Sequence, residues 1–239
     1  MALTGLDIYK QLPKTNCKEC GLPTCLAFAM KVAGGQAGLE DCPHLSDDAR
    51  GTLDEASAPP QRLVKIGPDS AMIEIGQETV LYRHDERFHH PTAVALVVSD
   101  TTDEGALKKA CEDFKSLQFL RVGETIHPDM IALTNDSGSP ETFKSAAATI
   151  HNAAGVGLVL ISEKVDALSS AAGAVSGARP VLYCTSDASA DELAGLAKRA
   201  SAPVCVAGDI ESVAQKVEAL GKKEVKDVLI SPGRVSTTD

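Results

Sequence analysis

The stretch VCVAGDIESVAQKVEALGKKEVKDVLIS, residues 204–231, contains one complete strand-helix-strand unit. It begins with the apolar run VCVA and ends with VLIS, and continuous apolar runs are typical of strands buried on both faces of a parallel sheet. Between them, Asp209 precedes a segment whose apolar residues recur every three or four positions, which predicts a helix capped by this aspartate. The stretch therefore indicates an α/β protein.

The same unit repeats along the chain from about residue 92. Six apolar runs each end in a polar turn: TAVALVV, MIALT, LVLI, VLYC, VCVA and VLIS. The last four begin at residues 158, 181, 204 and 228, so they follow one another at steps of 23, 23 and 24 residues. One intervening helix has a clear start, because Ser139 precedes Pro140 as an N-cap precedes proline at the first helical position. Six such units predict either part of a β/α barrel, which needs eight, or a doubly wound sheet.

The composition upstream of the repeat changes twice. Consecutive prolines in DEASAPPQR, residues 54–62, predict a linker. Short alternating segments over residues 63–82 predict a hairpin or small meander that bridges the two parts of the chain. We expect three regions: residues 1–58, a small cysteine-bearing domain; residues 59–91, a linker and β-hairpin bridge; and residues 92–239, the repeated units.

Charge and composition exclude several classes of function. The 23 Lys and Arg residues against 33 Asp and Glu residues give a net charge of −10, whereas nucleic-acid and anionic-membrane binders need a basic surface. The chain has no long apolar run and no signal-peptide core. We expect no nucleic-acid partner, no membrane contact and a cytoplasmic location.

Four of the seven cysteines cluster near the start of the chain: Cys17, Cys20, Cys25 and Cys42. In a reducing compartment, clustered thiols more often bind a metal than form disulfides. The other three, Cys111, Cys184 and Cys205, lie in apolar surroundings, where a thiol behaves as a small hydrophobic residue.

The spacing of the four clustered cysteines favours a [4Fe-4S] cluster. Cys17 and Cys20 flank a tight turn with Gly21 after it, and Pro23 predicts the start of a helix whose first turn carries Cys25. Cys42 is followed by Pro43, as the last cysteine of bacterial ferredoxin runs is followed by proline. Structural zinc is the alternative, although zinc ribbons usually have two matched Cys-x2-Cys pairs and this chain has one.

At these residues the sequence resembles a known family. LTGLDIYKQLPKTNCKECGLPTCLAFAMKVAGGQAGLEDCPHLSDDA, residues 3–49, is similar to the start of the large (gamma) subunit of the corrinoid/iron-sulfur protein of the acetyl-CoA decarbonylase/synthase, or Wood-Ljungdahl, pathway. The likeness continues through APPQRLVKIG, LYRHDERFHHPTAVALVVSD and the strand-forming runs. The cysteine pattern alone also resembles electron-transfer subunits of the Rnf type.

The resemblance implies the fold: a small N-terminal [4Fe-4S] module followed by an incomplete, six-unit TIM-type β/α barrel. It implies that Cys17, Cys20, Cys25 and Cys42 are the cluster ligands. Because the family continues into a C-terminal corrinoid-binding domain, we expect that domain to be absent, the chain to be an N-terminal portion, and this chain alone not to hold a corrinoid (cobamide).

The resemblance also implies the function. The cluster would deliver an electron that reduces Co(II) to Co(I), and the complex would accept a methyl group from methyl-tetrahydropterin and pass it to acetyl-CoA synthase. The implied partners are the corrinoid/iron-sulfur protein small subunit, a methyltransferase, and acetyl-CoA synthase/carbon monoxide dehydrogenase. The alternative is a generic Rnf-type, ferredoxin-like electron-transfer module fused to an inert barrel.

No catalytic residue is predicted. His84, His89 and His90 lie in a polar junction, and we expect solvated or packing roles for them, because no cysteine or paired carboxylate completes a metal site. Acidic residues follow several predicted strands, and we interpret most of them as caps of the next helix: Asp100, Asp136, Glu163, Asp187 and Asp209.

Overall fold

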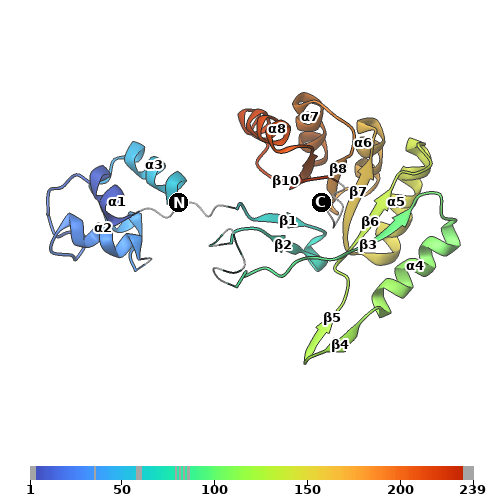
Figure 1. Ribbon diagram of the computed structural model, residues 1–239, viewed down its shortest axis with the longest axis horizontal. Helices are drawn as coiled ribbons and strands as arrows, with labels where there is room; N and C mark the ends of the chain where they lie inside the picture. The colour runs from blue at the N-terminus through green and yellow to red at the C-terminus, as the bar shows by residue number, and fades with distance from the viewer. Residues whose placement is uncertain are drawn as a thin grey trace. The chain divides into compact units, whose positions relative to one another are not determined.

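The chain forms two compact units, residues 1–60 and 61–239. Figure 1 shows the computed structural model, which describes residues 4–34, 36–57, 61–78, 80, 82, 84 and 87–233. Each unit has a hydrophobic core of its own. The segment 59–91, expected to bridge the two parts, belongs to the second unit from Gln61 onward in its described part.

The first unit is helical. It contains α1 (Gly5–Gln11), α2 (Cys25–Ala33), the short 3-10 helix η1 (Leu39–Asp41) and α3 (Asp47–Ser57). Helix α3 runs to Ser57, so the first residues of the stretch 54–62 are helical, and residues 58–60 lie outside the described residues. The core combines apolar side chains from all of these helices with two of the clustered cysteines: Ile8, Leu12, Cys25, Phe28, Ala29, Leu39, Cys42, Leu45, Ala49 and Leu53.

The second unit is built on a six-stranded parallel sheet, and all six predicted strands are confirmed. The strands are β3 (Ala95–Ser99), β6 (Met130–Thr134), β7 (Gly157–Ser162), β8 (Val181–Cys184), β9 (Val204–Ala207) and β10 (Val228–Ser231). Their order across the sheet is β10-β9-β8-β7-β6-β3, the order of the chain itself. Among the described residues no pairing joins β3 to β10, so the unit is a parallel α/β sheet domain with two edges.

The helices of this unit cover one face of the sheet. They are α4 (Glu104–Ser116), α5 (Pro140–Ala154), α6 (Val165–Ala174), α7 (Ala190–Ala200) and α8 (Ile210–Lys222), and consecutive helices pack side by side. Ser139 and Asp209 cap α5 and α8, as predicted. Crossovers between parallel strands are right-handed, so a strand order that never reverses places every helix on the same side. The doubly wound alternative is therefore wrong, because that sheet reverses its order and is covered on both faces.

The other face of the sheet carries a predicted hairpin. Strands β1 (Val64–Ile66) and β2 (Ile73–Ile75) pair antiparallel, flank the short helix η2 (Asp69–Ala71), and pack on Met130, Val181 and Cys205. The contact is close: a Cβ added at Gly157 would lie 2.9 Å from Cδ1 of Ile73. Glycine at this position thus allows the hairpin to seat against the start of β7.

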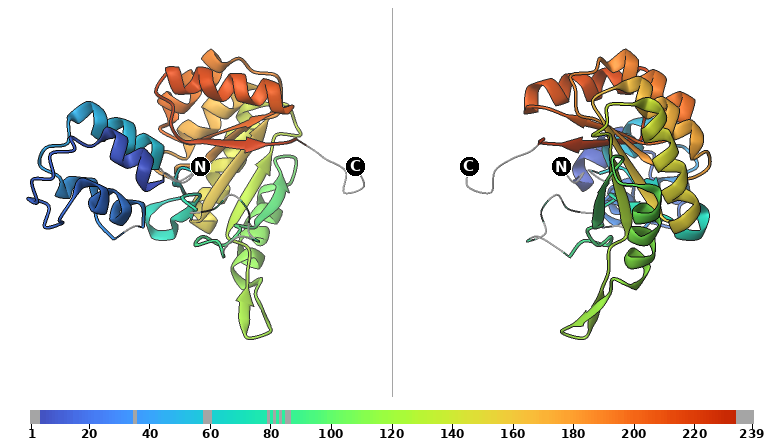
Figure 2. Two further views of the ribbon diagram at one scale, coloured as in Figure 1. Left: turned by 60° about the vertical axis from the view of Figure 1, so that its left-hand side comes forward. Right: turned by 90° about the vertical axis from the view of Figure 1, so that its right-hand side faces the viewer.

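A second hairpin was not anticipated from the sequence. Between α4 and β6, strands β4 (Phe119–Arg121) and β5 (Glu124–Ile126) form a two-stranded ribbon whose residues are all exposed. Both views of Figure 2 show this ribbon projecting away from the sheet and its helices.

Candidate metal centre

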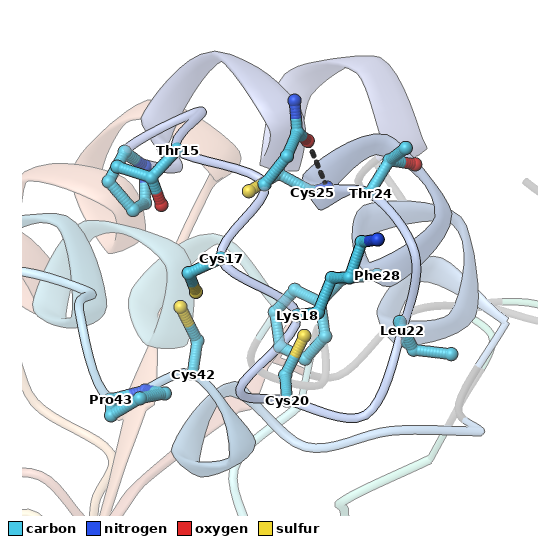
Figure 3. Close-up of a pocket in the computed structure, with 12 residues that line it drawn as sticks. Thr15, Cys17, Lys18, Cys20, Leu22, Thr24, Cys25, Phe28, Cys42 and Pro43 are labelled. Carbon is cyan, nitrogen blue, oxygen red and sulfur yellow. Dashed lines mark hydrogen bonds between the residues drawn. The ribbon is translucent and has the colours of Figure 1, made fainter.

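The structure brings the four clustered cysteines together. Cys17 and Cys20 lie on the loop between α1 and α2, Cys25 is the first residue of α2, and Cys42 follows η1. All four line one pocket, and Figure 3 shows the sulfur atoms of Cys17 and Cys42 pointing toward each other. Residues 25 positions apart in the sequence therefore present thiols to a common hollow.

The loop that carries Cys17 and Cys20 has an unusual backbone. Lys14, Asn16 and Lys18 have positive φ angles of 59°, 50° and 68°, and Gly21 has a φ of 76°. Nests of backbone N–H groups around phosphate and Fe–S sites are built from left-handed residues that alternate with right-handed ones. The positive φ angles of this loop are of the kind that such nests contain.

The start of α2 fixes the third thiol. Thr24, not Pro23, begins the helix as its N-cap: its side chain accepts a hydrogen bond from the Ala27 N–H, so the helix starts two residues later than predicted. The side chain of Asn16 accepts a hydrogen bond of 2.8 Å from the Cys25 N–H and ties the loop to the helix. Cys25 thus sits in the first turn of α2, at the positive end of the helix dipole.

Burial differs across the pocket. Cys25 and Cys42 are buried in the helical core, Cys20 is half-buried and Cys17 is exposed. One side of the pocket is therefore anchored in the core, while the other opens to solvent at Cys17.

The donor set fits an iron-sulfur cluster. Four soft thiols line one hollow, and the module is of a size at which a metal centre commonly supplements the core. A tetrahedral zinc ion also accepts four thiolates, so the donor set alone leaves both groups chemically possible.

Two residues beside the pocket were missed from the sequence. His44 and Glu19 are joined by a 2.9 Å contact between Nε2 and Oε2, and their ligand atoms and the Cys17 sulfur all lie within 4.8 Å of one another. Zinc accepts this mixture of sulfur, imidazole and carboxylate. The available signal was their spacing, because Glu19 lies between two cysteines and His44 follows Cys42 by two positions.

The remaining cysteines have structural surroundings. Cys111, Cys184 and Cys205 are buried in the second unit, and none of them lines the four-cysteine pocket. Burial raises the pKa of the Cys205 thiol to about 11 and also raises the pKa of Cys111. Their predicted role as core residues is confirmed.

The histidines of the junction form no metal group among the described residues. His84 stacks on Tyr82 with ring centroids 5.5 Å apart. The backbone N–H groups of His89 and His90 donate to the buried carboxylate of Glu78 at 2.6 and 2.8 Å. His90 and Glu78 also border an apolar hollow of about 380 Å³ between the β1-β2 hairpin and the sheet.

The acidic residues at the strand ends behave differently from the prediction, since only Asp209 caps a helix. Buried Asp100 instead accepts hydrogen bonds from the N–H and hydroxyl of Ser137 at 2.9 and 2.5 Å, which joins the ends of β3 and β6. Asp187 pairs with Lys216. Asp136 accepts a hydrogen bond from Thr134, and α6 begins after Lys164 rather than Glu163.

Comparisons with known proteins match both units. A family model described as "CO dehydrogenase/acetyl-CoA synthase delta subunit" matches residues 63–238, and one described as "Putative Fe-S cluster" matches residues 12–44. The corrinoid/iron-sulfur protein large subunit of Moorella thermoacetica is 42% identical over 239 residues, which cover 100% of this chain and 54% of that protein. Subunit gamma of the acetyl-CoA decarbonylase/synthase complex of Methanothermobacter thermautotrophicus is 33% identical over 235 residues, or 98% of this chain and 51% of that protein.

Fold and pocket define the chain as an α/β sheet protein joined to a small helical unit whose four thiols suit a soft metal or an iron-sulfur cluster. The chain belongs to the CO dehydrogenase/acetyl-CoA synthase delta subunit family, and the predicted resemblance to corrinoid/iron-sulfur protein large subunits is confirmed. It spans about half the length of the curated relatives it matches. No described helix has the length and apolarity needed to span a membrane.

Proposed function

We propose that the first unit holds one [4Fe-4S] cluster through Cys17, Cys20, Cys25 and Cys42. The observation that carries the proposal is the convergence of these four thiols on one pocket. The match of residues 12–44 to an Fe-S model supports iron over zinc. Thiolates anchored at a helix start and in a helical core would hold the cluster, and the positive-φ loop would direct N–H groups toward it.

Single Cys→Ser variants at the four positions test the ligand set. Each should lower iron and sulfide binding after anaerobic reconstitution, measured by visible absorption and chemical iron analysis. Cys184→Ser is the matched control, because its thiol lies in the second unit and already faces the Ser186 hydroxyl at 3.2 Å. Unchanged iron binding in all four variants would contradict the proposal.

The second step of the proposal is that the unit passes electrons to a corrinoid. When bound, a cluster of this kind supplies one-electron transfer. The pocket opens to solvent beside Cys17, so an electron acceptor can approach there while Cys25 and Cys42 keep the opposite side covered. The relatives are named as corrinoid/iron-sulfur proteins, which supports reduction of Co(II) to Co(I) as the purpose of that electron.

The electron step can be tested in trans. Protein with a reduced cluster is mixed anaerobically with cob(II)alamin, and loss of the Co(II) EPR signal is followed; a cluster-free Cys42→Ser sample is the control. Equal loss in both samples would contradict the proposed electron transfer.

The relatives' names also support a place in a larger assembly. In it, a methyl group from methyl-tetrahydropterin would pass through the corrinoid to acetyl-CoA synthase/carbon monoxide dehydrogenase. The partners would be the corrinoid/iron-sulfur protein small subunit and a methyltransferase. Because clustered thiols of this kind suit a reducing compartment, a cytoplasmic location is part of the proposal. The family match over residues 63–238 favours this role over the Rnf-type alternative, in which the sheet domain would be inert.

The sheet domain would form part of a TIM-type barrel. Two features support this: the strand order follows the chain, and the helices cover one face only. Both are properties of a barrel wall. The division into residues 1–58, 59–91 and 92–239 likewise stays a prediction.

A further inference from the structure

Three metal-binding side chains meet at the solvent side of the four-cysteine pocket. The Cys17 sulfur, a Glu19 carboxylate oxygen and a His44 ring nitrogen all lie within 4.8 Å of one another, and all three residues are exposed. Among the described residues, no other three His, Cys, Asp or Glu side chains bring their ligand atoms this close together, the four thiols of the pocket included. These three residues, here called the trio, therefore need less rearrangement to bind a single ion than the four thiols do.

Two hydrogen-bonded turns fix the backbone of the trio. The Gly21 N–H donates at 2.9 Å to the carbonyl three residues before it, which closes a turn around Glu19. The Leu45 N–H donates at 3.4 Å to the Cys42 carbonyl, which closes a second turn around His44. Leu45 is buried in the helical core, so the second turn is anchored there. Only the exposed side chains of the trio have to adjust when an ion binds.

The donor atoms of the trio are spaced nearly as they would be around zinc. Zinc binds sulfur at about 2.3 Å and nitrogen or oxygen at about 2.0 to 2.2 Å, so tetrahedral ligand atoms lie roughly 3.3 to 3.8 Å apart. His44 Nε2 and Glu19 Oε2 are 2.9 Å apart, and the Cys17 sulfur lies within 4.8 Å of a ligand atom of each. Shifts of about 1 Å bring all three atoms to the zinc distances, and exposed side chains make such shifts by small rotations.

The donor types of the trio select a transition-metal ion. Calcium and magnesium prefer sites made of oxygen ligands, whereas thiolate and imidazole ligands suit zinc. One thiolate and one carboxylate supply two negative charges, which balance the charge of a divalent ion. Three protein ligands leave a fourth position to water, as in zinc sites that are open to exchange, whereas structural zinc sites have four protein ligands. The trio is therefore suited to an exchangeable zinc ion.

Cys17 belongs both to the trio and to the four-cysteine pocket. On the pocket side, its sulfur and the sulfur of Cys42 point toward each other (Figure 3). Cys25 and Cys42 are held in the helical core, whereas Cys17 is exposed, so Cys17 is the ligand most easily withdrawn from the pocket. A Cys17 thiolate that binds an ion at the trio is not available to a cluster in the pocket.

We propose that the cluster-free chain binds one zinc ion through Cys17, Glu19 and His44, and that this ion prevents assembly of the cluster by occupying Cys17. The first part stands on the trio alone, and the second part rests on the proposed function. Zinc binding displaces the proton of the Cys17 thiol and changes no oxidation state. The trio thus makes loading of the pocket sensitive to zinc, because the cluster can form only after the ion leaves.

Zinc titration of the full, reduced, cluster-free chain under argon tests the site, with a chromophoric zinc chelator as competitor. His44→Ala and Glu19→Gln should each lower the zinc affinity about 10-fold or more, since even the hydrogen-bond partners of metal ligands are worth about 10- to 100-fold. Cys20→Ser and Cys25→Ser should leave the affinity unchanged. Cobalt(II) in place of zinc should give a charge-transfer band with the intensity of one thiolate rather than four.

His127→Ala is the matched control, because His127 is also exposed and lies 3.7 Å from a carboxylate, that of Asp129, but in the second unit and without a cysteine. Its zinc affinity should equal that of the wild type. Zinc affinity that Cys25→Ser lowers and His44→Ala leaves unchanged would place the ion on the four thiols and overturn the proposal. So would the absence of zinc binding by the wild type.

Cluster assembly tests the second part. One equivalent of zinc is added before ferrous iron and sulfide, and cluster formation is followed by visible absorption. Zinc should lower the cluster yield of the wild type but not that of His44→Ala, whose four thiols are intact. Equal inhibition of both proteins, or no inhibition of the wild type, would overturn this part. Failure of the zinc-free wild type to form a cluster would instead contradict the proposed function, and the zinc titration would still decide the site.

Discussion

Replacing Phe28 by alanine should unfold the first unit and leave the second intact. Phe28 is 1% exposed, packs in the helical core and also lines the four-cysteine pocket. Removing a buried phenylalanine side chain costs about 3 to 5 kcal/mol of unfolding free energy. A unit of 60 residues has a total stability of about 3 to 9 kcal/mol at the usual value per residue. The loss therefore takes away much or all of the stability of the cluster-free unit.

Hydrogen exchange followed by mass spectrometry on the full cluster-free chain gives the readout. Amides of α1 and α2 should lose protection in Phe28→Ala, while those of β6 and β7 keep it. Phe143→Ala is the matched control, because Phe143 is fully buried in the second unit and its loss should reverse the pattern. Undiminished protection of α1 and α2 in Phe28→Ala, or loss of protection in both units together, would refute the reasoning.

Three further outcomes are expected. Gly157→Ala should destabilise the second unit by about 1 to 3 kcal/mol in thermal unfolding, because the new Cβ would lie 2.9 Å from Cδ1 of Ile73. Gly173→Ala is the control: its Cβ meets open space in α6, so it should stabilise the unit by about 0.5 to 1 kcal/mol. Equal effects of the two substitutions would contradict the close approach of hairpin and sheet. Burial opposes ionisation of Glu78, but hydrogen bonds from the backbone N–H groups of His90 and His89 outweigh it and hold the pKa of the carboxyl below its usual 4.5. This carboxylate therefore contributes to the free energy of unfolding above pH 4.5, and that contribution is lost as the pH falls through the lower folded-state pKa. In urea titrations, the free energy of unfolding of Glu78→Gln should fall less than that of the wild type as the pH is lowered from 4.5 through that pKa. Iodoacetamide at pH 8 should label exposed Cys17 of the cluster-free chain well before Cys205, whose pKa is raised to about 11; comparable labelling rates would show that the second unit opens.

The sheet could be predicted from sequence because each of its strands is a continuous apolar run between polar turns, spaced by one helix. Helix starts at Ser139 and Asp209 could be predicted because the cap is encoded by one side chain. The choice between a barrel wall and a doubly wound sheet could not, because it depends on the side to which each crossover passes. The strand order of the folded chain excludes the doubly wound sheet.

The thiol donors of the pocket could be predicted from the sequence, but the side chains beside them could not. Cysteine spacing identified the four thiols that line it. The pairing of Glu19 with His44 joins residues 25 positions apart, and only their places near Cys20 and Cys42 in the sequence indicated it. The β4-β5 hairpin was missed because Val122-Gly123 is an atypical turn and because its apolar residues are exposed rather than buried.

Native mass spectrometry of the anaerobically purified chain tests the central claim most directly, because it counts bound atoms on the intact protein. We predict a mass increase that corresponds to four iron and four sulfide per chain, absent from Cys25→Ser and retained in Cys184→Ser. One zinc ion per chain in place of that mass, in protein never exposed to air, would contradict the account.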